Sequence, residues 1–216
     1  MTTQIQIVRK ASYVMISDKI KWNAGEMYLV GKELNVNSLI LENTGFAAEL
    51  DHSQVALNIV VNEMKNFIQT NQKSPILKDN YHYNPAQTLL EASEMINNQL
   101  LFLREMIFEE TRKEFFPNLP SRQKCIWVIP KEREILTYWM PKLKTPDAII
   151  YELNLTGKIH RSNPQPLEIH SAPPALIRKS AYRYWLGTMG DETPKDECIF
   201  EGLVKVEKVI DANSVG

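Results

Sequence analysis

Three separate stretches of this sequence carry side chains suited to bind a charged or flat ligand. Ser121 and Arg122 lie directly before an apolar run, where the fork of donors on an arginine can grip a phosphate or carboxylate at two points. Residues 180–185 (SAYRYW) place three aromatic rings and an arginine within six positions, enough for a platform on which a flat ring could stack. Glu197 stands before another apolar run and supplies a carboxylate.

Each of these stretches also has a purely structural interpretation. Arg122 could equally pair with a glutamate of the long helix expected before it, and aromatic rings at helical spacing commonly belong to a core. A lone glutamate at the entrance of a strand is usually a solvated charge. The local sequence leaves both interpretations open for all three stretches.

Several common site chemistries have no motif in the chain. The patterns G-x-G-x-x-G, G-x-x-x-x-G-K-[ST], G-x-S-x-G and H-E-x-x-H do not occur, so Rossmann, P-loop, hydrolase-elbow and zincin sites are not indicated. The four histidines never stand at metal-ligand spacing, and no metal is expected. Two cysteines, Cys125 and Cys198, are too few for a disulfide framework and fit a reducing cytosol.

The elements that must position these residues follow from hydrophobic periodicity. Alternation over residues 4–9 predicts a strand, and two further extended segments are expected at residues 12–16 and 27–30. Apolar residues at helical spacing then predict a helix over residues 57–68 and an unusually long one over residues 85–115. These two helices are expected to pack against each other.

The remainder of the chain returns to strand-like patterns. Three strands and two helices are expected, with strands at residues 125–129, 148–153 and 199–209 and helices at residues 130–140 and 175–186. Gly202 is a candidate bulge in the last strand, and Pro141 is expected to follow the end of the first of these helices. The prolines within residues 161–174 predict a loop that no helix spans.

Size and composition limit the architecture. The 216 residues predict a single domain, residues 1–216, with a helical insertion at about residues 53–116. Hydrophobic residues make up 44% and charged residues 24%, which excludes collagen-like, wholly disordered and multispanning membrane proteins. A net charge of −1 argues against binding that depends mainly on neutralising nucleic-acid phosphates. Because no signal-peptide or membrane-spanning stretch occurs, a soluble, cytoplasmic protein is expected.

Three motifs give the chain a family resemblance. The stretches EETRKEFFPNLPSR, YRYW and ECIFEGLVKV, in this order, resemble a little-characterised bacterial and phage family of ADP-ribosyltransferase-like proteins. The resemblance covers both ends and the region from Glu109 onward. It implies an α+β fold, an ADP-ribosyltransferase-like split mixed or antiparallel sheet with an inserted pair of long helices. It also implies NAD as substrate and a macromolecular acceptor, protein or nucleic acid, as for a toxin, effector or phage factor.

The resemblance also assigns roles to individual residues. Glu197 would be the catalytic carboxylate, because breaking the nicotinamide–ribose bond builds positive charge that a nearby carboxylate stabilises. Arg122, beside Ser121, would grip the pyrophosphate and hold NAD in register. Tyr182 or Trp185 would stack on the nicotinamide ring.

The first strand departs from the family pattern. A histidine or arginine usually contacts NAD there, whereas this chain has Gln6, with Arg9 on the opposite face. A glutamine can form hydrogen bonds to a ribose hydroxyl but carries no charge. Either Arg9 replaces the missing contact or the protein is a pseudoenzyme. The alternative function is therefore a non-enzymatic binding protein that associates, as a homodimer for instance, through the long helical arm.

Overall fold

The structure is a computed structural model that describes residues 6–35, 37, 85–143, 145, 147–169, 172–187 and 195–211, with side chains of the long helix described from residue 96 onward. The chain divides into two compact units, one formed by Met1–Leu39 with Leu103–Gly216 and the other by Ile40–Phe102. The helix expected at residues 57–68 lies outside the described residues. The single domain with an insertion at residues 53–116 stays a prediction.

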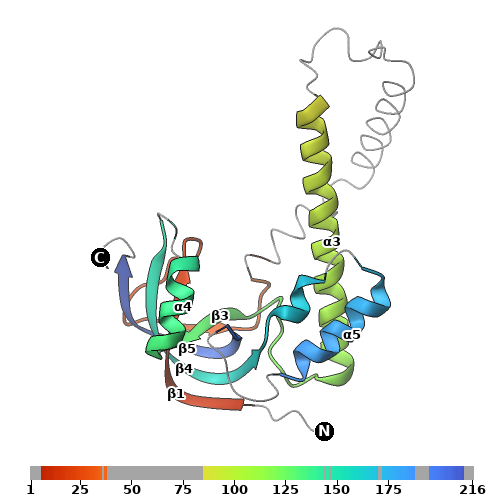
Figure 1. Ribbon diagram of the computed structural model, residues 1–216. Helices are drawn as coiled ribbons and strands as arrows, with labels where there is room; N and C mark the ends of the chain where they lie inside the picture. The colour runs from red at the N-terminus through yellow and green to blue at the C-terminus, as the bar shows by residue number, and fades with distance from the viewer. Residues whose placement is uncertain are drawn as a thin grey trace, which may run out of the picture. The chain divides into compact units, whose positions relative to one another are not determined.

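The first unit contains five strands, all paired antiparallel. They are β1 (Gln6–Ser17), β2 (Met27–Val30), β3 (Ile126–Pro130), β4 (Ile149–Ser162) and β5 (Glu197–Asp211). β1 pairs with β3 and β4, and β5 also pairs with β3 and β4, so the ladder of these four strands closes on itself. β2 pairs with β5 beyond the residues that pair with β3. The four strands of the closed ladder are labelled in Figure 1. The expected α+β class is confirmed, with an antiparallel sheet.

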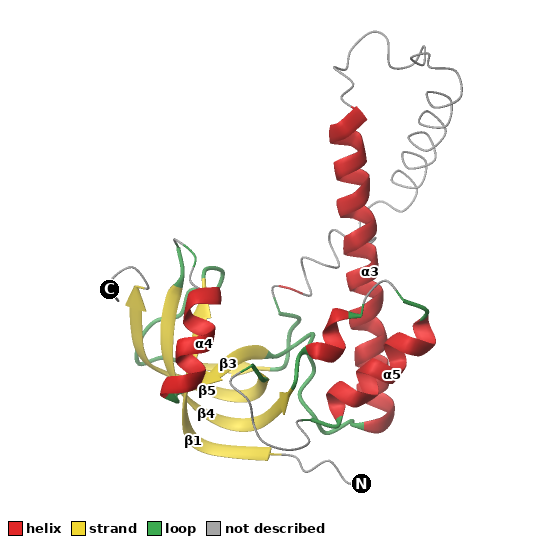
Figure 2. Ribbon diagram, in the orientation of Figure 1, coloured by secondary structure: helices red, strands yellow, loops and turns green. Residues whose placement is uncertain are grey.

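Three α-helices accompany the sheet in the described part of the chain. The long helix α3 (Pro85–Phe115) has the expected bounds, and its first proline loses nothing because first-turn N–H groups have no partner within a helix. Helix α4 (Arg133–Leu143) contacts β3 and β1, whereas α5 (Pro174–Trp185) packs with the C-terminal part of α3 (Figure 2). The expected end of α4 before Pro141 is wrong, because the helix continues through this proline to its last turn.

The first strand is one element rather than the two segments expected at residues 4–9 and 12–16. It runs without interruption from Gln6 to Ser17, and its register against β4 shifts between Val8 and Ala11. Lys10 within this irregularity has φ 51°. A bulge of this kind changes which residues face the core while the strand continues, and this explains the break in the alternating pattern.

The strands β4 and β5 are longer than expected, and Gly157 and Gly202, which pair with each other, have no room for a side chain between the two backbones. A Cβ on Gly202 would lie 2.6 Å from the Thr156 carbonyl oxygen, and one on Gly157 would lie 2.3 Å from the Glu201 carbonyl oxygen. The expected bulge at Gly202 is wrong, since the register is continuous there and shifts instead between Glu152 and Leu153. Gly202 serves the close approach of two backbones.

The loop expected over residues 161–174 is shorter than expected. β4 continues to Ser162, and a single 3₁₀ turn, η2 (Gln165–Glu168), follows. Its prolines stand at the first turn, where a missing N–H is tolerated, so they start this short helix rather than prevent it.

Three apolar clusters hold the unit together. The first fills the closed ladder and includes Tyr151, Leu153 and Phe200, all fully buried. The second joins α3, α5 and the outer face of the sheet through Phe108 and Trp185. The third lies under α4. Within the described residues, no helix combines the length and apolarity needed to cross a membrane.

Candidate functional site

Arg122, Tyr184 and Glu197 meet at one point, although they come from a turn, a helix and a strand. Arg122 lies in the turn before β3, Tyr184 in the last turn of α5, and Glu197 at the first position of β5. Arg122 Nη1 donates to Tyr184 Oη over 2.9 Å and also to Glu197 Oε1. Tyr184 Oη in turn donates to the same carboxylate oxygen over 2.5 Å. The three side chains form a closed triangle of hydrogen bonds.

Helix α3 adds Glu105 to this cluster. Arg122 Nε donates to Glu105 Oε2 over 3.0 Å, and Arg104 Nη2 donates to Glu105 Oε1 over 2.8 Å. Arg122 is thus paired with a glutamate of the long helix and with Glu197 at the same time. We call these five residues, Arg104, Glu105, Arg122, Tyr184 and Glu197, the arginine cluster.

The cluster is nearly enclosed, which strengthens its electrostatic interactions. Arg122 is 7% exposed and Tyr184 is fully buried. Burial disfavours the charge of Arg122, but Glu197, Tyr184 and Glu105 outweigh this, so the pKa of the guanidinium lies well above its ordinary value. Burial opposes ionisation of Glu105 as well, yet Arg122 and Arg104 lower the pKa of its carboxyl.

Tyr184 stays neutral in this setting and therefore acts as a hydrogen-bond donor. Burial, followed by the Glu197 charge, raises the pKa of its phenol well above the ordinary value. The backbone of the same residue is anchored by β4, because its carbonyl oxygen accepts hydrogen bonds from His160 Nε2 over 3.1 Å and from Ser162 Oγ over 2.7 Å. The last turn of α5 is thus held twice. The Tyr184 hydroxyl group is bound by Arg122 and Glu197, and the Tyr184 carbonyl group is bound by β4.

Two atoms at the outer edge of the cluster keep hydrogen-bonding capacity. Both bonds to Glu197 use Oε1, and within the described part of the chain its Oε2 has no hydrogen-bond partner. Arg122 Nη2 is likewise without a partner among those residues. Neither atom is enclosed by the protein. The largely buried pair of Glu197 and Arg122 therefore keeps one acceptor atom and one donor atom that are not completely enclosed.

The two aromatic residues proposed for stacking lie outside the arginine cluster. Tyr182 is 41% exposed and packs against Phe115 and Phe116, with ring centroids 5.4 and 5.2 Å away. Trp185 is fully buried, and its Nε1 donates to the Phe108 carbonyl oxygen over 2.8 Å.

Tyr184, whose hydroxyl group is hydrogen bonded to Arg122, was not among the site residues expected from the sequence. On α5, Ile177, Ala181 and Tyr184 share the buried face, at spacings of four and three residues. That periodicity was the available signal, because it separates Tyr184 from the exposed Tyr182.

The other candidate residues are also placed apart from the cluster. Ser121 Oγ donates to Glu109 Oε2 over 2.9 Å, and Glu109 is also bound by Arg112, so Ser121 belongs to a neighbouring buried pair. Gln6 and Arg9 are exposed on β1. In the described part of the chain neither is hydrogen bonded to Arg122 or Glu197.

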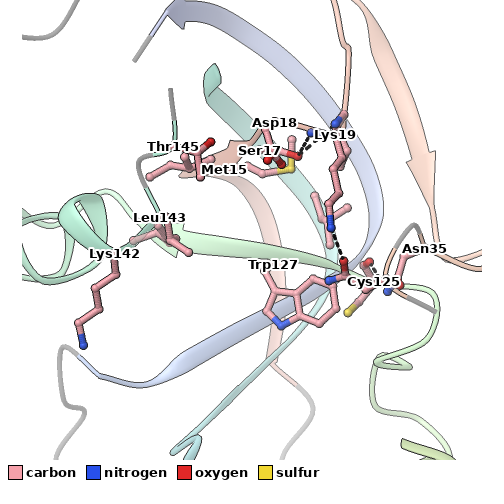
Figure 3. A pocket seen from close by; sticks show the side chains of 15 residues that line it. Met15, Ser17, Asp18, Lys19, Asn35, Cys125, Trp127, Lys142, Leu143 and Thr145 are labelled. Carbon is pink, nitrogen blue, oxygen red and sulfur yellow. Dashed lines mark hydrogen bonds between the residues drawn. The ribbon is translucent and has the colours of Figure 1, made fainter. Parts of the chain in front are cut away.

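A cleft that the sequence did not predict opens beside β3 and has a volume of about 350 Å³ (Figure 3). It is lined by Met15, Ile16, Ser17, Asp18, Lys19, Ile20, Asn35, Asn37, Cys125, Ile126, Trp127, Ile129, Lys142, Leu143 and Thr145. Trp127 links it to the arginine cluster, because the Arg122 guanidinium carbon lies 5.7 Å from the centroid of the Trp127 ring. Across the described residues, no group of three or more histidine, cysteine or acidic side chains is arranged to hold a metal ion.

A family model matches most of the chain. The model of a family described as "Protein of unknown function (DUF2441)" matches residues 9–212. No curated protein matches the chain. The function therefore has to be argued from the site itself.

Proposed function

Since the chain belongs to the DUF2441 family, which carries no assigned activity, we propose from its own site that it is an NAD-dependent ADP-ribosyltransferase. The observation that carries the proposal is the convergence of Arg122, Tyr184 and Glu197 from three distant stretches. The acceptor would be a macromolecule, protein or nucleic acid. An ADP-ribosyltransferase-like arrangement of the sheet is part of the same proposal.

Glu197 is the catalytic carboxylate in this proposal. Cleavage of the bond between nicotinamide and ribose leaves positive charge on the ribose, which a carboxylate a few Å away stabilises more in the transition state than in the ground state. Tyr184 and Arg122 hold Oε1 in place, and the accessible Oε2 is left to face the sugar. Fixing the carboxylate before the substrate arrives avoids reorganisation during the reaction.

Arg122 acts mainly as a positioning residue. Its Nε and Nη1 are engaged by Glu105, Tyr184 and Glu197, so only Nη2 remains to donate to an oxygen of the dinucleotide. The two-point grip on the pyrophosphate that the sequence suggested would require one of these ion pairs to open. A single hydrogen bond to a ribose or phosphate oxygen requires no such change.

The decisive experiment measures nicotinamide release from NAD by the purified chain, with and without cell lysate as a source of acceptor. We expect slow release alone, faster release with lysate, and a loss of about 10²-fold or more in Glu197→Gln. The matched control is Glu207→Gln on the same strand, whose side chain is 44% exposed and paired with Lys205. If the wild-type protein is folded and neither binds NAD nor releases nicotinamide, the proposal is wrong.

A second candidate function is non-enzymatic association through α3, for instance as a homodimer. It is supported by two large apolar side chains left exposed on the part of this helix that belongs to the first unit, Leu103 at 40% and Met106 at 41%. Their spacing of three places them on one face of the helix. We expect Leu103→Asp to reduce any self-association seen in sedimentation velocity without unfolding the protein. A wild-type protein that is monomeric at high concentration would exclude the homodimer.

A further inference from the structure

The cleft beside β3 has the size and composition of a small-molecule site. Its volume of about 350 Å³ lies within the range of protein ligand pockets. The walls are predominantly apolar, with Met15, Ile126 and Ile129 almost fully buried behind the surface. Trp127 is partly exposed in the cleft and offers a flat ring for stacking. An apolar body with a ring would bury most of its surface here.

Lys19 supplies a cation to the lining of this cleft. Lys19 Nζ donates to Asn37 Oδ1 over 3.4 Å, which leaves two of its N–H groups available. Ser17 Oγ accepts hydrogen bonds from the backbone N–H groups of Lys19 and Ile20 over 3.2 and 3.1 Å, and this fixes the turn that carries the lysine. The backbone that carries Lys19 is therefore held by local structure, whereas its exposed ammonium group is held by Asn37 alone.

Asn35, on the same side of the cleft as Lys19, is also held by hydrogen bonds (Figure 3). Asn35 Nδ2 donates to the carbonyl oxygens of Arg122 and Cys125 over 2.6 and 3.1 Å, and the Asn35 N–H donates to the Gln123 carbonyl oxygen over 2.7 Å. These bonds hold Asn35 at the entrance of β3. A site built from side chains held in this way loses little entropy when a ligand binds.

The charges around the cleft favour an anion near Lys19. Lys142 is the second cation of the lining, and its side chain extends away from the other labelled residues, with Nζ 3.7 Å from the centroid of the Tyr138 ring (Figure 3). Asp18 is the single acidic residue among the lining side chains, and it is exposed. Of the two lysines it is therefore Lys19 that offers an ammonium group to a ligand, because its side chain extends toward Cys125 and Trp127 (Figure 3).

We propose that this cleft binds a small organic anion with a flat apolar body, such as an aromatic carboxylate or an aryl phosphate. The body lies against Trp127 and the isoleucines of β3, and the acidic group contacts Lys19. Trp127 lies next to Arg122, but none of the five residues of the arginine cluster lines the cleft. The proposal is thus independent of NAD chemistry at Glu197.

The probes are 1-naphthoate and its uncharged analogue 1-naphthamide, titrated into the full chain by calorimetry. Naphthoate is expected to bind about fivefold more tightly than the amide at low salt, and this difference is expected to shrink as salt is added. Lys19→Gln should weaken naphthoate binding to the level of the amide and leave amide binding unchanged. The matched control, Lys179→Gln on the exposed face of α5, should change neither.

A second variant tests the location of the site. Leu143, 37% exposed at the end of α4, can be enlarged with Leu143→Trp, which fills the cleft from its rim and should abolish binding of both probes with an unchanged melting temperature. The indole N–H resonance of Trp127, assigned with Trp127→Phe, should shift on titration of the wild-type protein. Absence of naphthoate binding, equal binding of both probes, or binding that survives Leu143→Trp would each overturn the proposal.

Discussion

Glu197 and Arg122 stand 75 positions apart in the sequence and form an ion pair with side chains only 13% and 7% exposed. The pair joins the first residue of β5 to the turn that leads into β3. The two strands themselves pair from Ile126 with Phe200 to Val128 with Cys198. Because Glu105 binds the same guanidinium, one arginine holds the sheet and helix α3 together. The same contacts that orient the proposed catalytic carboxylate therefore also stabilise the fold.

Replacing Arg122 by leucine should strongly destabilise the protein. Both Glu105 and Glu197 would lose their shared cation while remaining largely buried, a loss that typically costs about 3–5 kcal/mol. Urea unfolding of Arg122→Leu measures the free energy. Arg178→Leu is the control, because its ion pair with Glu114 is about half exposed and should contribute less than about 1 kcal/mol. Equal costs for the two variants would contradict the structural role of Arg122.

Tyr184→Phe tests the hydroxyl group alone. The substitution keeps the ring in the core but removes the donor to Glu197 and the acceptor for Arg122, with an expected cost of about 1–3 kcal/mol. Tyr182→Phe removes an exposed hydroxyl from the same helix and should change stability by less than about 0.5 kcal/mol. Thermal and urea unfolding of the two variants distinguish the buried network from ordinary helix packing.

His160 should make the protein sensitive to mild acid. Burial, together with the nearby Arg122 charge, lowers the pKa of this histidine from 6.5 to about 4, although its bond to the Tyr184 carbonyl opposes the shift. The unfolded chain therefore takes up a proton first as the pH falls. The contribution of His160 to the free energy of unfolding is therefore intact above pH 6.5. This contribution declines by about 3 kcal/mol in total as the pH falls to about 4.

The comparison for this prediction is His160→Gln, whose amide can still donate to the Tyr184 carbonyl oxygen but does not titrate. Unfolding free energies of both proteins, measured from pH 7.5 to 4, should diverge in slope over that interval. Parallel curves would show that His160 does not contribute to the acid sensitivity.

Alanine substitutions at two glycines with positive φ distinguish the energetic cost of steric crowding from that of backbone strain. Gly202 has φ 145° and no room for a Cβ beside Thr156 and Gly157, whereas Gly25 has φ 85° and nothing within 4 Å of that position. Gly202→Ala should cost at least about 3 kcal/mol, and Gly25→Ala only about 1 kcal/mol. A similar loss of melting temperature in both variants would mean that the β4–β5 crossing can open.

The element types could largely be predicted from the sequence because they depend on local periodicity. The bounds of α3 and β2 agree with the pattern. The ends of β4 and β5 could not be predicted, since their length depends on pairing with each other, at residues about 50 positions apart. The predicted end of α4 before Pro141 was wrong for a related reason. Tertiary packing of α4 on β3 outweighs the loss of one helical hydrogen bond at this proline.

The site could be predicted only in part. Arg122 and Glu197 stood out because each precedes an apolar strand, but no local signal indicates that they touch. Choosing Tyr184 over Tyr182 requires the rotation of α5 about its axis, which the contact with Phe108 sets. The cleft combines the turn after β1, Asn35 and Asn37, part of β3 and the end of α4, so no contiguous motif in the sequence indicates it.

The closed ladder of β1, β3, β4 and β5 also constrains how the chain can assemble. Until β5 has left the ribosome, β3 and β4 each keep an unpaired edge, and the enclosed apolar cluster lacks Phe200, Val204 and Val206. A nascent chain that stops before β5 therefore exposes unpaired strand edges, which can pair with other chains, instead of forming a smaller stable sheet. Chaperone dependence during synthesis should be greatest in the interval before this last strand is released.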